Sequence, residues 1–132
     1  MEVSTNWIIG LPSHKSAQDV RALIKASIDT NADYAQYAIL QLLPGCEMFE
    51  DAVREGVIHR ERWAEFVCDP VPNYKIEAYE KHLSIEDLSK LYKECHNRFY
   101  RRPGYLFSRL KKVRSIGELV TKLKVGLKIL AG

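Results

Sequence analysis

Two short apolar segments near the N-terminus constrain the fold of this chain more than any other feature. The first, residues 3–9, stops at Gly10-Leu11-Pro12, and glycine and proline at that place are typical of a turn after a strand. The second, residues 34–43, is a dense apolar run that ends at Pro44-Gly45. Its density predicts a strand that is buried on both faces.

Between these two segments the sequence predicts one helix. Ser16 and Asp19 form an S-x-x-D capping box, and Val20, Ile24 and Ile28 follow at helical spacing. A helix that connects two strands is the crossover that pairs them in parallel. The sequence therefore predicts a strand–helix–strand unit of an α/β fold.

The rest of the chain is expected to be mainly helical. Short helices are predicted at residues 47–55 and 60–67, and the prolines within 68–75 predict an irregular stretch. Ser84 is the expected cap of a long helix that ends before Pro103-Gly104. The apolar stripe expected on that helix consists of Leu88, Leu91, Tyr92, Cys95 and Phe99. The last two predicted helices cover residues 105–113 and 115–130.

Two parallel strands form only a small, incomplete sheet, and parallel sheets are normally covered on both faces. The economical interpretation is that the two strands are neighbours in a larger sheet or barrel whose other strands lie upstream. The expected fold class is thus α/β, a partial (β/α) barrel fragment. Residues 1–58 are predicted to be the C-terminal end of the barrel, and residues 59–132 a helical C-terminal extension.

The composition indicates the cellular location of the chain and the redox state of its cysteines. The 132 residues contain no apolar run near the roughly 20 residues that cross a bilayer. The start, residues 1–4, lacks the layout of a secretory signal, so a cytoplasmic location is expected. Cys46, Cys68 and Cys95 are too far apart for a C-x-x-C pattern, and three reduced thiols are expected.

The net charge of +3 hides a strong asymmetry along the chain. Residues 96–132 carry ten Lys and Arg against one acidic residue, a net charge of +9. An alternative function follows from this, namely a stand-alone interaction module whose basic C-terminal helices bind RNA, a membrane surface or a protein partner. Nucleic-acid binding is not expected, because Phe99 and Tyr105 suit a core. Peripheral membrane contact by the final helix, which carries Lys122, Lys124 and Lys128, is the weaker alternative to packing against a protein.

The order and spacing of several motifs resemble a known family over almost the whole chain. The segment Ile8-Ile9-Gly10-Leu11-Pro12, residues 33–40 and then Pro44-Gly45 are similar to the late barrel strands of radical S-adenosylmethionine enzymes. The similarity is greatest to the cobalamin-binding group that includes anaerobic magnesium-protoporphyrin monomethyl ester cyclase. Downstream, Trp63-x-x-Phe66, Pro70-x-Pro72 and Arg98-Phe99-Tyr100-x-Arg102-Pro103-x-Tyr105 are similar to the C-terminal helical region of that group.

The sequence also departs from the family at defined places. The family commonly has G-L-P-G-E-T, whereas this chain continues after Pro12 with Ser13-His14-Lys15. The family commonly has T-P-x-P-G-T, whereas this chain has Gln41-Leu42-Leu43-Pro44-Gly45-Cys46. The C-x-x-x-C-x-x-C loop that holds the family's iron–sulfur cluster is missing from these 132 residues.

The resemblance implies an oxidoreductase, cyclase or methylase that uses S-adenosylmethionine and a 4Fe-4S cluster, and in some members cobalamin. In such enzymes the reduced cluster cleaves S-adenosylmethionine to a 5′-deoxyadenosyl radical, and the protein positions and shields the reactants. Because this chain lacks the cluster ligands, it is expected to be catalytically inactive alone and to bind no metal. The expected partners are the remainder of the barrel or upstream domains, and a small-molecule substrate of the parent enzyme.

Barrel enzymes build their sites from the loops at the C-terminal ends of the strands. The candidate cofactor-binding residues are therefore Gly10, Leu11, Pro12, Gln41, Pro44 and Gly45. The same motifs also suit ordinary strand-end turns, and both interpretations remain open. Gln36 and Gln41 are expected to be buried amides, with either a structural partner or a place in the barrel interior. His14 is expected to be a solvated loop side chain.

Overall fold

The computed structural model describes residues 2–70 and 77–111. The chain groups into two compact units, Met1–Asn97 and Arg98–Gly132, and each is described by itself. The helix expected at residues 115–130 lies outside the described residues, as does most of the irregular stretch expected at 68–75.

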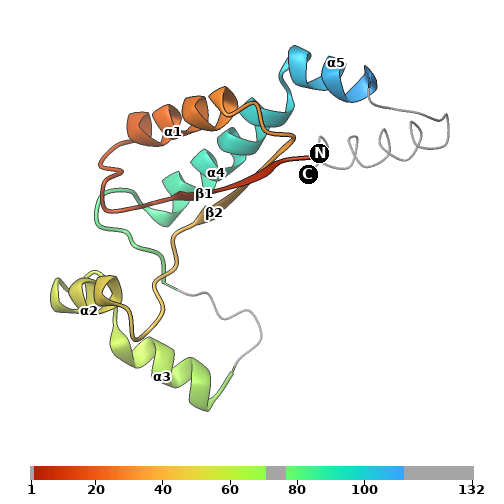
Figure 1. The fold of residues 1–132 in the computed structure, drawn as a ribbon. Helices are drawn as coiled ribbons and strands as arrows, with labels where there is room; N and C mark the ends of the chain where they lie inside the picture. Colours follow the sequence, from red (N-terminus) through yellow and green to blue (C-terminus); the bar gives the residue numbers. More distant parts are fainter. Residues whose placement is uncertain (1, 71–76, 112–132) are drawn as a thin grey trace. The chain divides into compact units, whose positions relative to one another are not determined.

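The first unit opens with the predicted strand–helix–strand arrangement (Figure 1). Strand β1 (Ser4–Ile9) is followed by helix α1 (Ala17–Asp29) and strand β2 (Tyr34–Ile39). The two strands pair in parallel, with Ser4 opposite Tyr34 and Ile9 opposite Ile39. Within residues 2–70 and 77–111 the sheet has only these two strands. The expected α/β fold class is confirmed.

Helix α1 begins where its capping box predicts. The carboxylate of Asp19 accepts hydrogen bonds from the backbone N–H of Ser16 at 2.8 Å and from its hydroxyl at 2.9 Å. The helix ends at Asp29 with Thr30 as its C-cap, and Asn31 turns the chain with a φ of 51° before β2. Asparagine tolerates this left-handed conformation better than most residues do.

Within the residues that the structure describes, four further helices follow, in the order expected from the sequence. They are α2 (Glu47–Arg54), α3 (Arg60–Cys68), α4 (Ile85–Tyr100) and α5 (Pro103–Lys111). The hydroxyl of Ser84 accepts a hydrogen bond from the backbone N–H of Asp87 at 3.1 Å and caps α4 as predicted. Helix α5 begins at Pro103 and not at Tyr105, because proline suits the first helical position, where no N–H is needed.

One face of the sheet carries the core of the first unit. Ile9, Ala35 and Tyr37 on this face are buried. The hydroxyl of Tyr37 lies 2.5 Å from the hydroxyl of Ser27 in α1, and its ring meets His96 of α4 edge-on with centroids 5.2 Å apart. Because one side chain touches both helices, α1 and α4 cover the same face of the sheet.

The opposite face of the sheet is exposed. Along both strands every second residue is open to solvent, namely Ser4, Asn6 and Ile8 on β1 and Tyr34, Gln36 and Ala38 on β2. The expectation that β2 is buried on both faces is therefore wrong, and so is the expectation that Gln36 and Gln41 are buried amides. The predicted strand, residues 34–43, is also too long, since β2 ends at Ile39.

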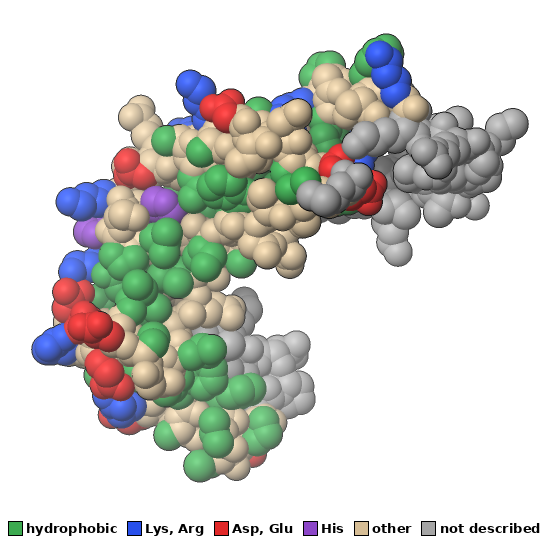
Figure 2. All heavy atoms as spheres, in the orientation of Figure 1, with side chains coloured by type: hydrophobic (Ala, Val, Ile, Leu, Met, Phe, Trp, Pro, Cys, Tyr) green, Lys and Arg blue, Asp and Glu red, His purple; other side chains and the backbone are tan. Residues whose placement is uncertain are grey.

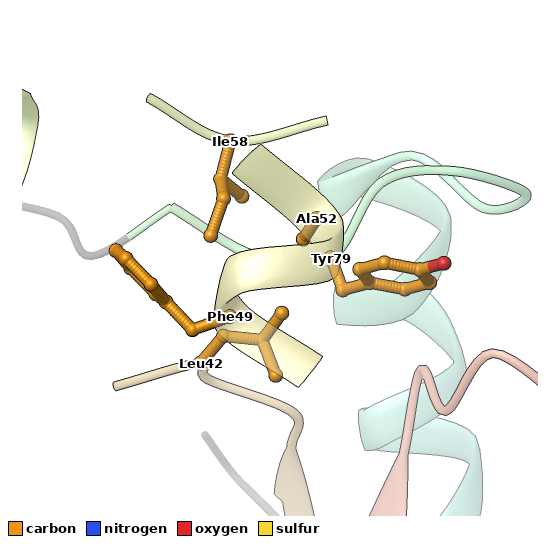
Figure 3. Packing of buried hydrophobic residues seen from close by; sticks show 5 residues of the cluster. All are labelled: Leu42, Phe49, Ala52, Ile58 and Tyr79. Atoms are coloured by element: carbon orange, nitrogen blue, oxygen red, sulfur yellow. The ribbon is translucent and has the colours of Figure 1, made fainter. Parts of the chain in front are cut away.

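A second small core explains why the apolar run continues beyond β2. Leu42 packs with Phe49, Ala52, Ile58 and Tyr79, and Figure 3 shows these five side chains gathered around α2. Leu40 and Trp63 pack against the same cluster. Leu40 and Leu42, which follow Ile39, thus belong to the core around α2 and not to the sheet, whereas Leu43 is 55% exposed.

The apolar stripe predicted for α4 is correct at four of its five positions. Leu88, Leu91, Cys95 and Phe99 are buried, whereas Tyr92 is 38% exposed. The ring of Tyr92 lies beside that of His96, with centroids 4.5 Å apart. A tyrosine can rest its ring on a neighbour and keep its hydroxyl in water, which helical spacing alone does not reveal.

Candidate functional site

The carboxyl ends of β1 and β2 lie next to each other, because parallel strands end at the same edge of a sheet. The backbone N–H of Leu40 donates to the carbonyl of Ile9 at 2.8 Å, which sets Gly10 beside Leu40. Two of the candidate positions, Gly10 and Gln41, thus follow neighbouring strand ends. Pro44 and Gly45 come later, in the connection to α2.

Gly10 makes its closest approach to the protein's own helix α4. Its φ of +83° is a conformation that favours glycine, and a Cβ placed on it would lie 3.3 Å from both methyl carbons of Leu88. The glycine at this strand end therefore lets the turn pack against α4. Any ligand contact by Gly10 would use its backbone.

The loop after β1 closes on itself through His14. The backbone N–H of His14 donates to the carbonyl of Leu11 at 2.8 Å, and the Nδ1 atom of His14 accepts from the N–H of Leu11 at 3.3 Å. His14 is only 8% exposed, so the expectation of a solvated loop histidine is wrong. Leu11 and Pro12 are half-buried in this closed turn.

Burial lowers the pKa of His14 below its usual value of 6.5, although the nearby carboxylate of Asp19 acts in the opposite direction. A protonated Nδ1 atom could not accept the N–H of Leu11. The unfolded chain therefore binds this proton more readily than the folded chain does. The contribution of His14 to stability is complete above about pH 6.5 and is lost as the pH falls below it.

We expect the free energy of unfolding of the wild-type chain to decrease as the pH falls from about 7.5 to about 5.5, a range of ~2 pH units around the ordinary histidine pKa. In the variant His14→Gln this part of the pH dependence should be lost. Urea unfolding of both proteins across this range, with an NMR titration of the His14 ring, is the measurement. A His14 pKa at or above 6.5, or the same pH dependence in both proteins, would show that the ring is not held neutral by its site.

On the β2 side, the candidate residues are exposed. The backbone of Gln41 forms an isolated antiparallel bridge with Ala78, while its side chain faces solvent. Pro44 and Gly45 are exposed as well, and Gly45 has a φ of +94° with no atom within 4 Å of a Cβ placed on it. Cys46 then precedes α2, and its thiol donates to the carbonyl of Leu43 at 3.2 Å.

The sequence pointed to Gln36 but not to Asn6, its partner on the open face of the sheet. Asn6 of β1 stands directly opposite Gln36 of β2, and both side chains are exposed. Residues 4–9 read Ser-Thr-Asn-Trp-Ile-Ile, three small or polar residues followed by three large apolar ones, so the sequence lacks the alternation that could have revealed Asn6. The pairing of the two amides depends on the register, which no single strand shows.

Metal-binding side chains are not gathered in the part of the chain that the structure describes. Within residues 2–70 and 77–111, no three His, Cys, Asp or Glu side chains are grouped so that they could hold a metal ion. Cys46 and Cys68 are exposed, and Cys95 is buried in α4. These residues therefore do not fit an iron–sulfur cluster.

The chain is similar to an uncharacterized methyltransferase from Pyrococcus horikoshii, with 31% identity over 102 residues. The similar region is 76% of this chain and 21% of the relative, so the chain spans about a fifth of the relative's length. No protein-family model matches the chain, and no solved structure matches it. None of the helices in the described ranges is long and apolar enough to cross a membrane.

Proposed function

We propose that this chain is the C-terminal part of a radical S-adenosylmethionine enzyme that transfers a methyl group. In this proposal β1 and β2 are two neighbouring strands of its (β/α) barrel, and α1 and α4 are helices on the outside. The loops after Ile9 and Ile39 then stand at the end of the barrel where such enzymes place their sites. The cluster ligands and the remaining strands are supplied by the rest of the enzyme.

The observation that carries the proposal is the one-sided cover of a parallel sheet. Parallel sheets occur almost only with both faces covered, yet here α1 and α4 lie on one face and the other is exposed. In a (β/α) barrel, helices cover the outer face and the inner face is closed by the other strands. An exposed inner face is what two strands taken from such a barrel would show.

The composition of the open face supports a polar interior. The cross-strand pair Asn6 and Gln36 offers two amides, each able to donate and accept hydrogen bonds. Ile8 and Ala38 form the next cross-strand pair on this face and lie one step closer to the carboxyl ends. We assign to Asn6 and Gln36 the role of holding polar groups of the cofactor or substrate inside the barrel.

The methyl-transfer part of the proposal rests on the relative. The relative is an uncharacterized methyltransferase, and the similar region covers about a fifth of its length. A segment of that size fits one piece of a larger catalytic domain. Among the reactions that the family resemblance allows, methyl transfer is therefore the one that we propose.

Within this enzyme the described residues act by positioning. The bound cluster would supply one-electron chemistry to S-adenosylmethionine, but the three cysteines of this chain do not fit it. The turn Gly10-Leu11-Pro12 shapes the strand end, and His14 fixes that turn through Leu11. Gln41 follows the neighbouring strand end, and Pro44 and Gly45 lie further along in the connection to α2. All three face solvent, where they are available to a ligand.

The test compares the complete protein with the 132-residue chain. The reading frame that contains this chain is searched for an in-frame C-x-x-x-C-x-x-C motif, and both proteins are reconstituted anaerobically with iron and sulfide. We expect iron–thiolate absorbance and cleavage of S-adenosylmethionine from the complete protein only. A stable cluster with cleavage by the 132-residue chain alone, or a complete frame without the motif, would overturn the proposal.

Variants of the complete protein test the open face. We expect Gln36→Ala to lower kcat/KM about tenfold, because one hydrogen bond to a ligand is lost. Gln18→Ala is the matched control, since Gln18 is an exposed amide on α1 away from the open face. Equal effects of the two substitutions on kcat/KM would show that Gln36 does not contact the cofactor or substrate.

A further inference from the structure

We propose that helix α5 (Pro103–Lys111) docks this protein on an anionic lipid surface. The proposal does not depend on the reaction proposed above. It starts from two adjacent apolar side chains, Leu106 and Phe107, which are 51% and 61% exposed. In Figure 2, hydrophobic and basic side chains lie next to each other over α5.

The charge around these side chains is complementary to an anionic surface. Residues 98–111 carry Arg98, Arg101, Arg102, Arg109 and Lys111 and no acidic residue. The same excess continues in the sequence to the end, where Glu118 is the one acidic residue after Asn97. Each basic side chain near an anionic membrane contributes about 1 kcal/mol of attraction, roughly fivefold in affinity.

The position of Lys111 fits the boundary between lipid headgroups and acyl chains. Its Nζ atom lies 4.8 Å from the centroid of the Phe107 ring. A ring that enters the acyl region beside an ammonium group that stays among the phosphates is the usual arrangement of an interfacial helix. Short amphipathic elements of this kind lie in the interface without crossing it.

A single-stranded nucleic acid fits residues 98–111 less well, because it binds by stacking its bases on exposed aromatic rings. Phe99 is buried, and its ring packs on that of Tyr105 with centroids 5.6 Å apart. The guanidinium of Arg102 lies 4.4 Å from the Phe99 ring, and that of Arg109 lies 5.2 Å from the Tyr105 ring. The rings of Phe99 and Tyr105 thus pack within the protein. Of the two exposed apolar side chains on α5, Leu106 and Phe107, one is aliphatic and cannot stack on a base.

The experiment measures co-sedimentation of the 132-residue chain with vesicles. One set is phosphatidylcholine alone, and the other is phosphatidylcholine mixed with phosphatidylglycerol. We expect binding to the mixed vesicles that weakens as the salt concentration rises, and little binding to the neutral ones. Equal binding to both sets, or none to either at low salt, overturns the proposal.

Two variants with matched controls locate the contact on α5. Phe107→Ser is expected to weaken vesicle binding about tenfold, and Lys111→Glu about fivefold or more. Val67→Ser also replaces an exposed apolar side chain with serine, on α3, and Lys25→Glu makes the same charge reversal on α1; both variants are expected to bind like the wild type. Circular dichroism confirms that each variant is folded.

Other occupants of this surface would give different results. Binding to single-stranded RNA that outcompetes vesicles and is unaffected by Phe107→Ser would assign the basic segment 98–111 to nucleic acid. A self-associated chain whose dimer is lost in Phe107→Ser, without vesicle binding, would assign the surface to a second copy. Either result overturns the lipid proposal.

Discussion

Phe49→Ala is expected to lower the free energy of unfolding by about 3–5 kcal/mol, the range for a fully buried phenylalanine. Phe49 has no exposed surface and sits in the cluster formed with Leu42, Ile58 and Tyr79. Without its ring, the segment around α2 loses most of its core. Urea unfolding followed by tryptophan fluorescence measures the effect, because Trp63 packs against this cluster.

The matched control for this substitution is Phe66→Ala. Phe66 is only half-buried and meets Trp63 edge-on, with centroids 6.1 Å apart. We expect it to cost about 1 kcal/mol, since an aromatic pair contributes about that much beyond its burial. Equal costs at the two positions would mean that the cluster around Phe49 does not stabilise this part of the chain.

Ion pairs around the same cluster cannot replace its core. Arg60 pairs with Glu50, and Lys81 pairs with Glu55 at 2.7 Å, but all four side chains are well exposed. Exposed pairs of this kind contribute about 0–1 kcal/mol. These ion pairs are therefore too weak to offset the loss of free energy of unfolding that is expected from Phe49→Ala.

Gly10→Ala is expected to lower the free energy of unfolding by about 2–5 kcal/mol. The positive φ of Gly10 costs an alanine roughly 1–2 kcal/mol, and the contact with the two methyl groups of Leu88 adds about 1–3 kcal/mol of overpacking. Gly45→Ala is the control, because Gly45 also has a positive φ but has open space around it. We expect the control to cost only the backbone strain, about 1–2 kcal/mol.

A double-mutant cycle separates the packing from the backbone strain. Leu88→Ala removes the methyl groups that an alanine at position 10 would meet. Gly10→Ala and Leu88→Ala together should thus cost less than the sum of the two single changes. Full additivity, or the same loss for Gly10→Ala and Gly45→Ala, would contradict the contact between the strand end and α4.

Local signals in the sequence were sufficient to predict the order of the helices and strands. The turn at Gly10, the capping box of Ser16 and Asp19, and the cap at Ser84 each act within a few residues. Burial was less predictable. Within the run at residues 34–43, Ala35 and Tyr37 are buried on the sheet face that α1 and α4 cover, and Leu40 and Leu42 pack around α2. One continuous apolar run therefore contributes residues to two separate cores, one under the sheet and one around α2.

The candidate site depended on contacts between distant parts of the chain. The imidazole of His14 is buried by the fold around its loop, and Leu88 reaches Gly10 from α4. The register that sets Asn6 opposite Gln36 is likewise a property of both strands. The choice of strand ends as candidates followed from the sequence, whereas the surroundings of each side chain required the fold.

The direction of the backbone along β1 shows which of its groups a further strand would meet. The carbonyls of Val3 and Ile9 accept hydrogen bonds from the N–H groups of Tyr34 and Leu40, so alternate residues of β1 face β2. The N–H groups of Ser4, Asn6 and Ile8 consequently point to the other edge. In a barrel, the carbonyls of a neighbouring strand would accept them.

Amide hydrogen exchange at Ser4, Asn6 and Ile8 is the most direct test of whether this sheet is part of a larger barrel. In the 132-residue chain these amides should exchange rapidly, and in the complete enzyme they should be slowed about a hundredfold or more by a neighbouring strand. Rapid exchange of all three in the complete enzyme, or strong protection in the 132-residue chain alone, would contradict the proposed barrel.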